Sequence, residues 1–234
     1  MTTLARERRK DLESTVRQAR RVAEAGALKE LEQLAVHHHE PWPSMTPEQR
    51  ALRNRLRAHG RQLGDKRDER RGIQSITHLI AECAYEQWHR MLFARFLAEN
   101  DLLIETDSGI AISLEDCHEL ARSRSEDWLT LASAFAVKML PQIFRQGDPV
   151  LEVDLPPETR SRLEDLLKKL PREVFAADDS LGWVYQFWQA DRKEAINKSG
   201  KKIEADELPA VTQLFTEDYM VLFLLHNTLS VVGR

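Results

Sequence analysis

Apolar residues recur at helical spacing along most of the chain, and this pattern predicts a mainly helical protein. The strongest pattern covers residues 73–99, where apolar side chains occupy several compatible faces, as in a helix at the centre of a core. Residues 4–34 form a second, amphipathic pattern with Arg and Glu on the polar face. Shorter helices are expected at residues 114–121, 126–144 and 158–170.

Proline and capping residues set the boundary between the first two helices. A Pro-rich linker is predicted near residues 41–47, because prolines remove backbone donors and push the preceding residue out of helical geometry. Thr46 then caps the next helix, and Gln49 is placed three residues later to complete a capping box. This helix is expected to run to about His59.

One segment has the pattern of a β-hairpin. Two short apolar stretches within residues 102–113 flank Asp107-Ser108-Gly109, and a glycine at that position supplies the positive φ that a tight turn needs. The expected fold class is therefore mainly α, with a helical N-terminal region and one small β-hairpin.

Charge is distributed unevenly along the chain. The formal net charge is −4, yet residues 1–95 carry 19 Lys and Arg against 13 Asp and Glu. The most basic stretch is Arg50 to Arg71, which is compatible with nucleic-acid binding. Solvated helices that pair Arg with Glu produce a similar composition, and charge alone favours this interpretation over nucleic-acid binding.

Several classes of site and location are disfavoured by composition. Cys83 and Cys117 belong to no CxxC pair, which argues against a zinc site or a disulfide framework and fits the reducing cytoplasm. A metal site at His37-His38-His39-Glu40 is also disfavoured, because adjacent histidines point in different directions and Pro41 breaks the helix that could align them. No apolar run of transmembrane length occurs, so no membrane association is expected.

Four segments in order carry a resemblance to a known family. Residues 181–189 place four aromatic side chains in six positions, a pattern that a buried helix alone would also explain. Together with residues 85–96, the polar residues 197–203 and the stretch 208–216, they resemble PglX-like adenine-specific DNA methyltransferases of BREX and DISARM phage-defence systems, which are related to type IIG restriction-modification enzymes.

The resemblance implies a cofactor-binding element near the C-terminal end of the chain. Residues Gln213, Phe215 and Thr216 match the motif X of adenine methyltransferases, which lies against S-adenosylmethionine, and they are the candidate cofactor contacts. Thr216 is also placed to cap the apolar helix that follows. A helix N-terminus offers free backbone N–H groups that suit the carboxylate of a methionyl group.

The motifs of the catalytic domain itself are missing from the sequence. No two glycines are separated by a single residue, and no Asn-Pro-Pro-Tyr sequence occurs. The family needs a glycine-rich turn to approach its cofactor and an Asn-Pro-Pro-Tyr loop to hold the flipped adenine. We therefore predict no catalytic residues and no metal ligands here, and a chain truncated before an α/β Rossmann-like methyltransferase domain, with residues 229–234 as a truncation or frameshift tail.

The sequence thus predicts three regions and two alternative functions. The regions are a basic helical segment (1–72), a helical domain with the hairpin (73–180), and an aromatic helix, polar loop and motif X-like helix (181–234). The first function is an N-terminal fragment of an S-adenosylmethionine-dependent, adenine-N6-specific DNA methyltransferase, inactive alone, with DNA, other defence-system subunits or the missing methyltransferase half as partners. The alternative is a non-enzymatic helical module that binds DNA or a partner protein through residues 50–71.

Overall fold

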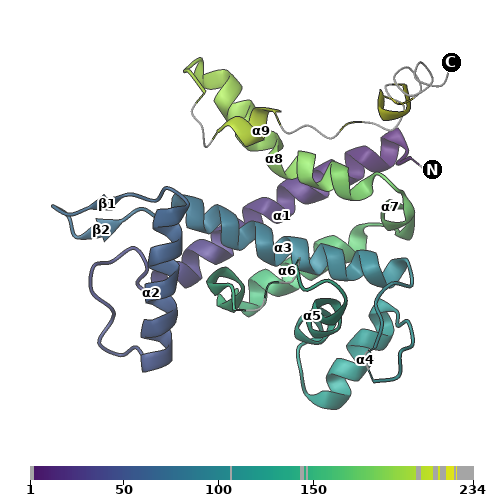
Figure 1. The fold of residues 1–234 in the computed structure, drawn as a ribbon, viewed down its shortest axis with the longest axis horizontal. Coiled ribbons are helices and arrows are strands. Elements are labelled where there is room, and N and C mark those ends of the chain that lie inside the picture. The colour runs from purple at the N-terminus through teal and green to yellow at the C-terminus, as the bar shows by residue number, and fades with distance from the viewer. Residues whose placement is uncertain are drawn as a thin grey trace. The chain divides into compact units, whose positions relative to one another are not determined.

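The chain folds almost entirely into helices, which confirms the predicted mainly α class (Figure 1). The structure is a computed structural model that describes residues 3–105, 107–142, 145, 147–203, 207–212, 216, 220–223 and 225. The chain divides into two compact units, a central unit (Ala19–Lys169) and a terminal unit (Met1–Gln18 with Leu170–Arg234). Within the described residues, no helix is long and apolar enough to cross a membrane.

Helix α1 (Arg6–Gln33) contributes residues to both units. The other elements of the central unit are α2 (Pro47–Gln62), β1 (Arg67–Asp68), β2 (Ile73–Gln74), α3 (Thr77–Glu99), α4 (Leu114–Arg124), α5 (Trp128–Met139), the 3-10 helix η1 (Pro149–Glu152) and α6 (Pro157–Lys169). The terminal unit contains α7 (Arg172–Ala176), α8 (Ser180–Ser199) and α9 (Leu208–Thr212). The short elements η1 and α7 were not anticipated from the sequence.

Helix α3 forms the core of the central unit, as its apolar pattern predicts. It packs against α2, α4, α5, α6 and η1, and its side chains Trp88 and Leu92 are almost completely buried. A helix covered on several sides has apolar residues on several faces, which is the pattern in the sequence. The helix begins at Thr77, later than the predicted start, because Ile73 belongs to β2.

The predicted capping box at the start of α2 is present. The backbone N–H of Gln49 donates to Thr46 Oγ1 at 3.3 Å, and Gln49 Oε1 accepts from the Thr46 N–H at 3.0 Å. Ser113 and Asp116 form the same reciprocal pair at the start of α4. Each box satisfies two backbone donors that a helix terminus leaves unpaired, so both helix starts are fixed by local sequence.

The hairpin predicted at residues 102–113 forms as a short antiparallel pairing, and not as a regular two-stranded sheet. The segment forms a single isolated bridge between Ile104 and Ala111, although Gly109 has the expected positive φ of 69°. The backbone N–H groups of Leu102 and Leu103 are both taken by the carbonyl of Leu97 at the end of α3. The Ile112 N–H donates to the carbonyl of Leu103 at 2.8 Å and the Glu105 N–H to that of Ile110 at 2.9 Å, whereas the regular two-stranded sheet is β1–β2.

Helix α5 is shorter than the predicted range 126–144. It starts at Trp128, where the Asp127 side chain accepts from the Thr130 N–H at 3.2 Å, and it ends at Met139. The residue that follows, Leu140, has φ −136° and precedes a proline. Proline disfavours helical geometry in the residue before it, which accounts for the earlier end.

The aromatic segment of α8 is part of the core of the terminal unit. Trp183 stacks on Phe187 with ring centroids 5.5 Å apart, and the guanidinium of Arg9 lies 4.6 Å from the centroid of the Trp183 ring. Asp179 accepts from Trp183 Nε1 at 2.9 Å and from the Leu4 N–H at 2.8 Å. These contacts give the aromatic cluster a structural role that joins the two ends of the chain within this unit.

Both cysteines are buried free thiols. Burial raises the pKa of the Cys83 thiol, and it raises the pKa of Cys117 to about 11. Cys117 Sγ donates to the carbonyl of Trp128 at 3.6 Å. Because the thiolate is the reactive form, neither residue has the environment of a catalytic or redox cysteine.

The half-buried imidazole of His89 makes the central unit sensitive to acid. Burial lowers the pKa of His89 from its ordinary value of 6.5, and the ring stacks between Tyr85 and Phe93. The folded state then binds fewer protons than the unfolded state below about pH 6.5, so its stability is full above this pH and declines as the pH falls through the folded pKa. We expect His89→Phe, which keeps a stacked ring without a titrating group, to reduce the loss of stability between pH 7.5 and 5.5. Urea unfolding at both pH values measures the difference, and an unchanged loss would exclude His89 as its source.

Candidate nucleic-acid interface

The sheet β1–β2 is a hairpin whose turn is made of charged residues. Arg67 pairs with Gln74 and Asp68 with Ile73, and the four residues between the strands are Glu69, Arg70, Arg71 and Gly72. The Arg71 N–H donates to Asp68 Oδ1 at 3.2 Å, and Gly72 has φ +64°, which glycine adopts without strain. The hairpin therefore presents a short, ordered turn rich in guanidinium groups.

The base of this hairpin is bonded to the loop that follows α1. The Gln74 N–H donates to the carbonyl of His37 at 2.8 Å, and an isolated bridge joins His38 to Ile73. The buried amide of Gln74 donates to the carbonyl of Arg57 at 3.0 Å. These contacts connect the hairpin to α2 and to the α1–α2 loop, and they fix the direction in which the turn points.

Asp65 lies just before β1 and links α2, the hairpin and α3. Its side chain is 3% exposed; Oδ1 accepts from the His78 N–H at 3.0 Å, and Oδ2 accepts from the Leu79 N–H at 3.1 Å. The preceding residue of α3, Ile76, makes no side-chain cap of its own. Asp65 therefore caps the core helix although it lies eleven residues before the N-cap position, Ile76. Ser75 Oγ donates a third hydrogen bond to Asp65 Oδ1 at 3.3 Å.

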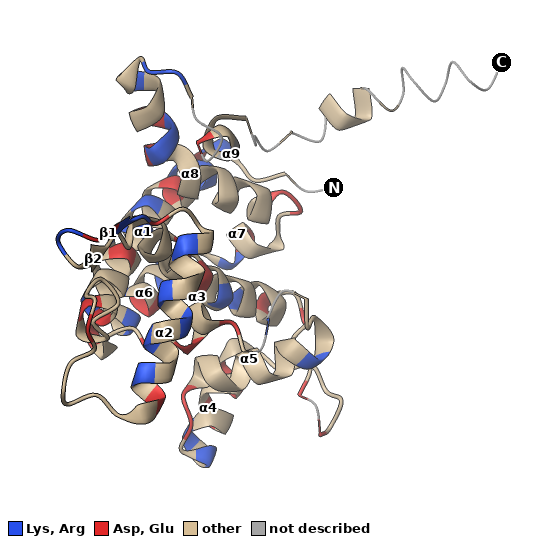
Figure 2. Cartoon of the chain, turned by 60° about the vertical axis from the view of Figure 1, so that its left-hand side comes forward, with Lys and Arg blue, Asp and Glu red and all other residues tan. Residues whose placement is uncertain are grey.

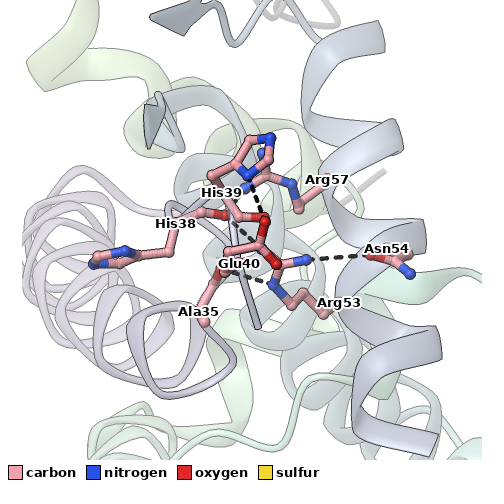
Figure 3. A network of polar contacts seen from close by, with 7 residues as sticks. All are labelled: Ala35, His38, His39, Glu40, Arg53, Asn54 and Arg57. Atoms are coloured by element: carbon pink, nitrogen blue, oxygen red, sulfur yellow. Dashed lines mark hydrogen bonds and ion pairs between the residues drawn. The ribbon is translucent and has the colours of Figure 1, made fainter. Parts of the chain in front are cut away.

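Two arginines of the basic stretch are structural. Arg53 and Arg57 are 4% and 6% exposed, and Figure 3 shows both side chains directed from α2 at the α1–α2 loop. Arg53 donates to the carbonyls of Ala35 at 2.9 Å and His39 at 2.8 Å, and both arginines donate to the carbonyl of His38. Burial, followed by the charge of Arg53, lowers the pKa of Arg57 to about 10, so it remains charged at neutral pH.

Three further arginines are held by partners within the chain. Arg55 forms a two-pronged ion pair with Glu152, in which Nη1 lies 2.7 Å from Oε1. Arg61 donates to the carbonyl of Arg57 at 2.9 Å. Arg50 donates to two carbonyl groups of the preceding loop. These interactions leave the hairpin as the part of the basic stretch with the most available positive charge.

The four basic residues of the hairpin are exposed, and Figure 2 shows this charge on the turn. Lys66, Arg67 and Arg70 form no ion pair with any residue that the structure describes, and Arg71 has a long contact of 3.8 Å with Asp68. We call Lys66, Arg67, Arg70 and Arg71 the basic hairpin. Exposed guanidinium groups without strong partners are suited to phosphate oxygens, which they bind in a planar, two-pronged manner.

The histidine-rich loop is held by packing and hydrogen bonds. The rings of His37 and His38 are 4.5 Å apart, edge to face, and His38 lies 4.6 Å from Trp42. His39 Nδ1 is 2.9 Å from a carboxylate oxygen of Glu40 (Figure 3). Across the described part of the chain, no group of three or more His, Cys, Asp or Glu side chains is placed to hold a metal ion.

The structure describes little of the predicted cofactor segment. Gln213 and Phe215 lie outside the described residues, while Thr216 is described and exposed. Residues 220–223 are helical, and their apolar side chains are 42–67% exposed. The assignment of Gln213, Phe215 and Thr216 to S-adenosylmethionine therefore stays a prediction.

Two known proteins are similar to this chain. Adenine-specific methyltransferase PglX of Lacticaseibacillus casei (strain Zhang) is 26% identical over 196 residues, which cover 66% of this chain and 16% of that protein. Adenine-specific methyltransferase BrxX of Escherichia coli O9:H4 (strain HS) is 35% identical over 98 residues, or 41% of this chain and 8% of that protein. The chain is related to PglX-like methyltransferases. It spans less than a fifth of the length of either relative, and neither a family model nor a solved structure matches it.

The basic stretch Arg50 to Arg71 of this chain contains residues of two kinds, structural arginines and exposed ones. The buried face of α2 consists of Arg53, Leu56, Arg57 and Gly60, which follow the spacing of an inward-facing helical stripe. That spacing around Leu56 was the signal that could have separated the structural arginines from the exposed ones. The hairpin gave no such signal, because its turn has no apolar residue and its strands have two residues each.

Proposed function

We propose that this chain is the helical N-terminal part of an S-adenosylmethionine-dependent enzyme that methylates adenine N6 in DNA, within a phage-defence or restriction-modification system. The observation that carries the proposal is the similarity to two relatives that are both named adenine-specific methyltransferases. We assign the methyl transfer itself to polypeptide other than these 234 residues, because they contain neither the glycine-rich turn nor the Asn-Pro-Pro-Tyr loop.

The basic hairpin is our candidate for the DNA contact. Its four cationic side chains outnumber the two carboxylates of Asp68 and Glu69 in the same turn. Electrostatic contacts of this kind position a protein on the phosphate backbone without reading the base sequence. The anchoring of the hairpin base to α2 and to the α1–α2 loop supports a contact at a fixed place, because these hydrogen bonds hold the strand from which the turn extends.

The candidate cofactor contacts Gln213, Phe215 and Thr216 belong to the same proposal. They are assigned by their similarity to motif X of adenine methyltransferases. The exposed apolar helix at residues 220–223 supports a role in which further polypeptide covers this segment. Other defence-system subunits or the catalytic half of the enzyme are the partners proposed to do so, in the cytoplasm.

Methyl transfer from labelled S-adenosylmethionine to duplex DNA tests this division of labour. We expect no incorporation with the purified chain alone, and incorporation when it is combined with a polypeptide encoded downstream that contains both missing motifs. Incorporation by the chain alone would contradict the division, and a downstream frame without both motifs, or an inactive combination with both, would contradict the proposed activity.

A non-enzymatic helical module that binds DNA or a partner protein is the second candidate. The exposed basic hairpin favours it, because phosphate binding of this kind needs no cofactor. The two candidates differ in a cell from which the gene is deleted. Loss of adenine methylation from the genome, read by methylation-sensitive sequencing, supports the enzyme, and unchanged methylation supports the independent module.

A further inference from the structure

A cavity of about 320 Å³ lies in the central unit, where residues of α3, α5 and α6 and of the segment around η1 line it. Helix α3 packs against each of the other three elements (Figure 1). The volume is at the lower end of the range of small-molecule sites, about 300–1,000 Å³. The cavity contains no residue of the basic hairpin and none of residues 213–216, so it is separate from the proposed DNA and cofactor contacts.

Three polar side chains in the cavity wall have buried atoms without a hydrogen-bond partner. These atoms are Nε of Arg90, Oγ of Ser133 and Nε of Arg160. The three residues belong to α3, α5 and α6, so no peculiarity of one helix explains them. Buried polar atoms in native proteins nearly always have a partner, and these three atoms give the cavity wall hydrogen-bonding groups that a bound polar molecule can satisfy.

Arg90 supplies a positive charge that has no hydrogen-bonded partner among the described residues, although the carboxylate of Glu86 acts on it from a distance. It makes no hydrogen bond or ion pair with any residue that the structure describes. Glu86, one turn earlier on α3, is paired with Arg145 at 3.2 Å. Burial lowers the pKa of Arg90, and the charge of Glu86 opposes this effect. A half-buried, unpaired guanidinium destabilises the free protein, and a bound anion would offset that cost.

The other charges on the wall limit what kind of anion can bind. Arg160 is shared between Asp127 at 3.7 Å and Asp154 at 3.2 Å, and the side chain of Asp154 is 94% exposed, so it lies at the rim. The two carboxylates balance Arg160 and add negative potential around the opening. A phosphate dianion or a nucleic-acid backbone would be repelled by them, whereas a single negative charge at Arg90 is accommodated.

The rest of the wall is mainly apolar. Its apolar residues are Leu129, Ala134 and Val137 of α5, with Leu151 of η1 and Leu155, and its polar residues are Gln87 of α3 and Thr130 of α5. An apolar wall beside one cationic group fits a ligand that has a hydrocarbon body and one charged end.

We propose that this cavity binds a small organic monocarboxylate. The carboxylate accepts hydrogen bonds from the Nε and Nη groups of Arg90 and from Ser133 Oγ, and the aliphatic or aromatic body lies against the leucines and small residues of α5. A carboxylate matches the planar fork of a guanidinium with two parallel hydrogen bonds.

Ligand-detected NMR on the full chain tests the proposal with hexanoate and benzoate as probes. Hexanamide and benzamide serve as controls of the same shape without charge, and inorganic phosphate serves as an anion without an apolar body. We expect saturable binding of both carboxylates and at least about tenfold weaker binding of the amides and of phosphate. Equal binding of amides and carboxylates, or stronger binding of phosphate, would refute the site.

Substitutions separate a ligand-binding Arg90 from a structural one. We expect Arg90→Met to abolish carboxylate binding and to raise the Tm of the ligand-free chain, because it removes an unpaired, half-buried charge. Arg90→Lys should bind weakly, since a point charge replaces the planar fork, and Ser133→Ala should bind several-fold more weakly. Arg162→Met, on the exposed side of α6, is the matched control and should bind as the parent does.

A fall in Tm for Arg90→Met, without added ligand, would identify Arg90 as a structural residue and overturn the inference. So would carboxylate binding that is unchanged in both Arg90→Lys and Ser133→Ala. These two variants keep the test decisive if Arg90→Met does not fold.

Discussion

Replacing Lys66, Arg67, Arg70 and Arg71 together with glutamine should lower the affinity of the chain for duplex DNA by at least about tenfold at low salt. Each cation that neutralises a phosphate releases counter-ions, so the slope of log affinity against log salt should fall by about 0.9 for every contact removed. The four side chains are exposed and poorly paired, so the fold should be unaffected. Fluorescence anisotropy with a labelled duplex at several salt concentrations measures both quantities.

The control must remove the same charge from another place. Arg122, Arg162, Lys168 and Lys169 are exposed on α4 and α6, and their replacement by glutamine changes the net charge by the same amount. We expect this control to retain most of the affinity and nearly all of the salt dependence. An equal loss in both variants would mean that overall charge, and not the hairpin, determines binding. Absence of DNA binding by the parent chain at low salt would contradict the interface itself.

Asp65→Ala should destabilise the central unit by about 3 kcal/mol, because it removes hydrogen bonds to a charged acceptor that are each worth roughly 1.5–3 kcal/mol. The N–H groups of His78 and Leu79 would lose their partner at the buried start of α3. For a chain of this size the loss corresponds to a fall in Tm of about 6–12 °C. Hydrogen exchange at those two amides should also accelerate.

Two variants define how specific this effect is. Asp65→Asn keeps an oxygen acceptor, so we expect about half of the loss or less, whereas Asp68→Ala changes an exposed aspartate and should cost no more than about 1 kcal/mol. The side chain of Asp68 is 45% exposed and contacts only the turn of its own hairpin. A loss below about 1 kcal/mol for Asp65→Ala would show that water replaces the carboxylate at the helix start.

Features that depend on residues close together in the sequence could be predicted. The capping box of Thr46 and Gln49 was predicted because both partners lie within one helical turn. The core helix α3 was predicted because its apolar residues alone identify burial on several faces. The positive φ at Gly109 was also correct, since a turn glycine needs no distant contact.

Features that depend on distant contacts could not be predicted. The capping of α3 by Asp65 joins residues separated by a hairpin that has no apolar alternation to reveal it. The burial of Arg53 and Arg57 depends on carbonyls of the α1–α2 loop, which come into reach only when α1 and α2 pack. The cavity around Arg90 likewise needs three helices and an arginine that no local rule distinguishes from a surface residue.

The predicted cofactor site belongs to neither group, because it was predicted from a resemblance and not from local rules or distant contacts. Its residues were assigned from a resemblance, and a resemblance gives the order of motifs without the surfaces that complete them. Of the three, Thr216 is the one that the structure describes, and it is exposed. The physical reason is general: a ligand site shared with another domain has no complete set of contacts in one part of the protein.

Among the residues that the structure describes, β1–β2 is secured to the protein through Asp65 and Gln74 at its open end and through the bridge between Ile73 and His38. Within the described part of the chain, the side-chain hydrogen bond that involves the loop from Glu69 to Gly72 stays inside the hairpin. Insertions and substitutions in that loop should therefore change its length and charge while the helices keep their contacts with one another. Residues 69–72 could therefore be replaced by the loop of a distant homologue, joined at positions 68 and 73. The hybrid protein should then show the binding preference of that homologue.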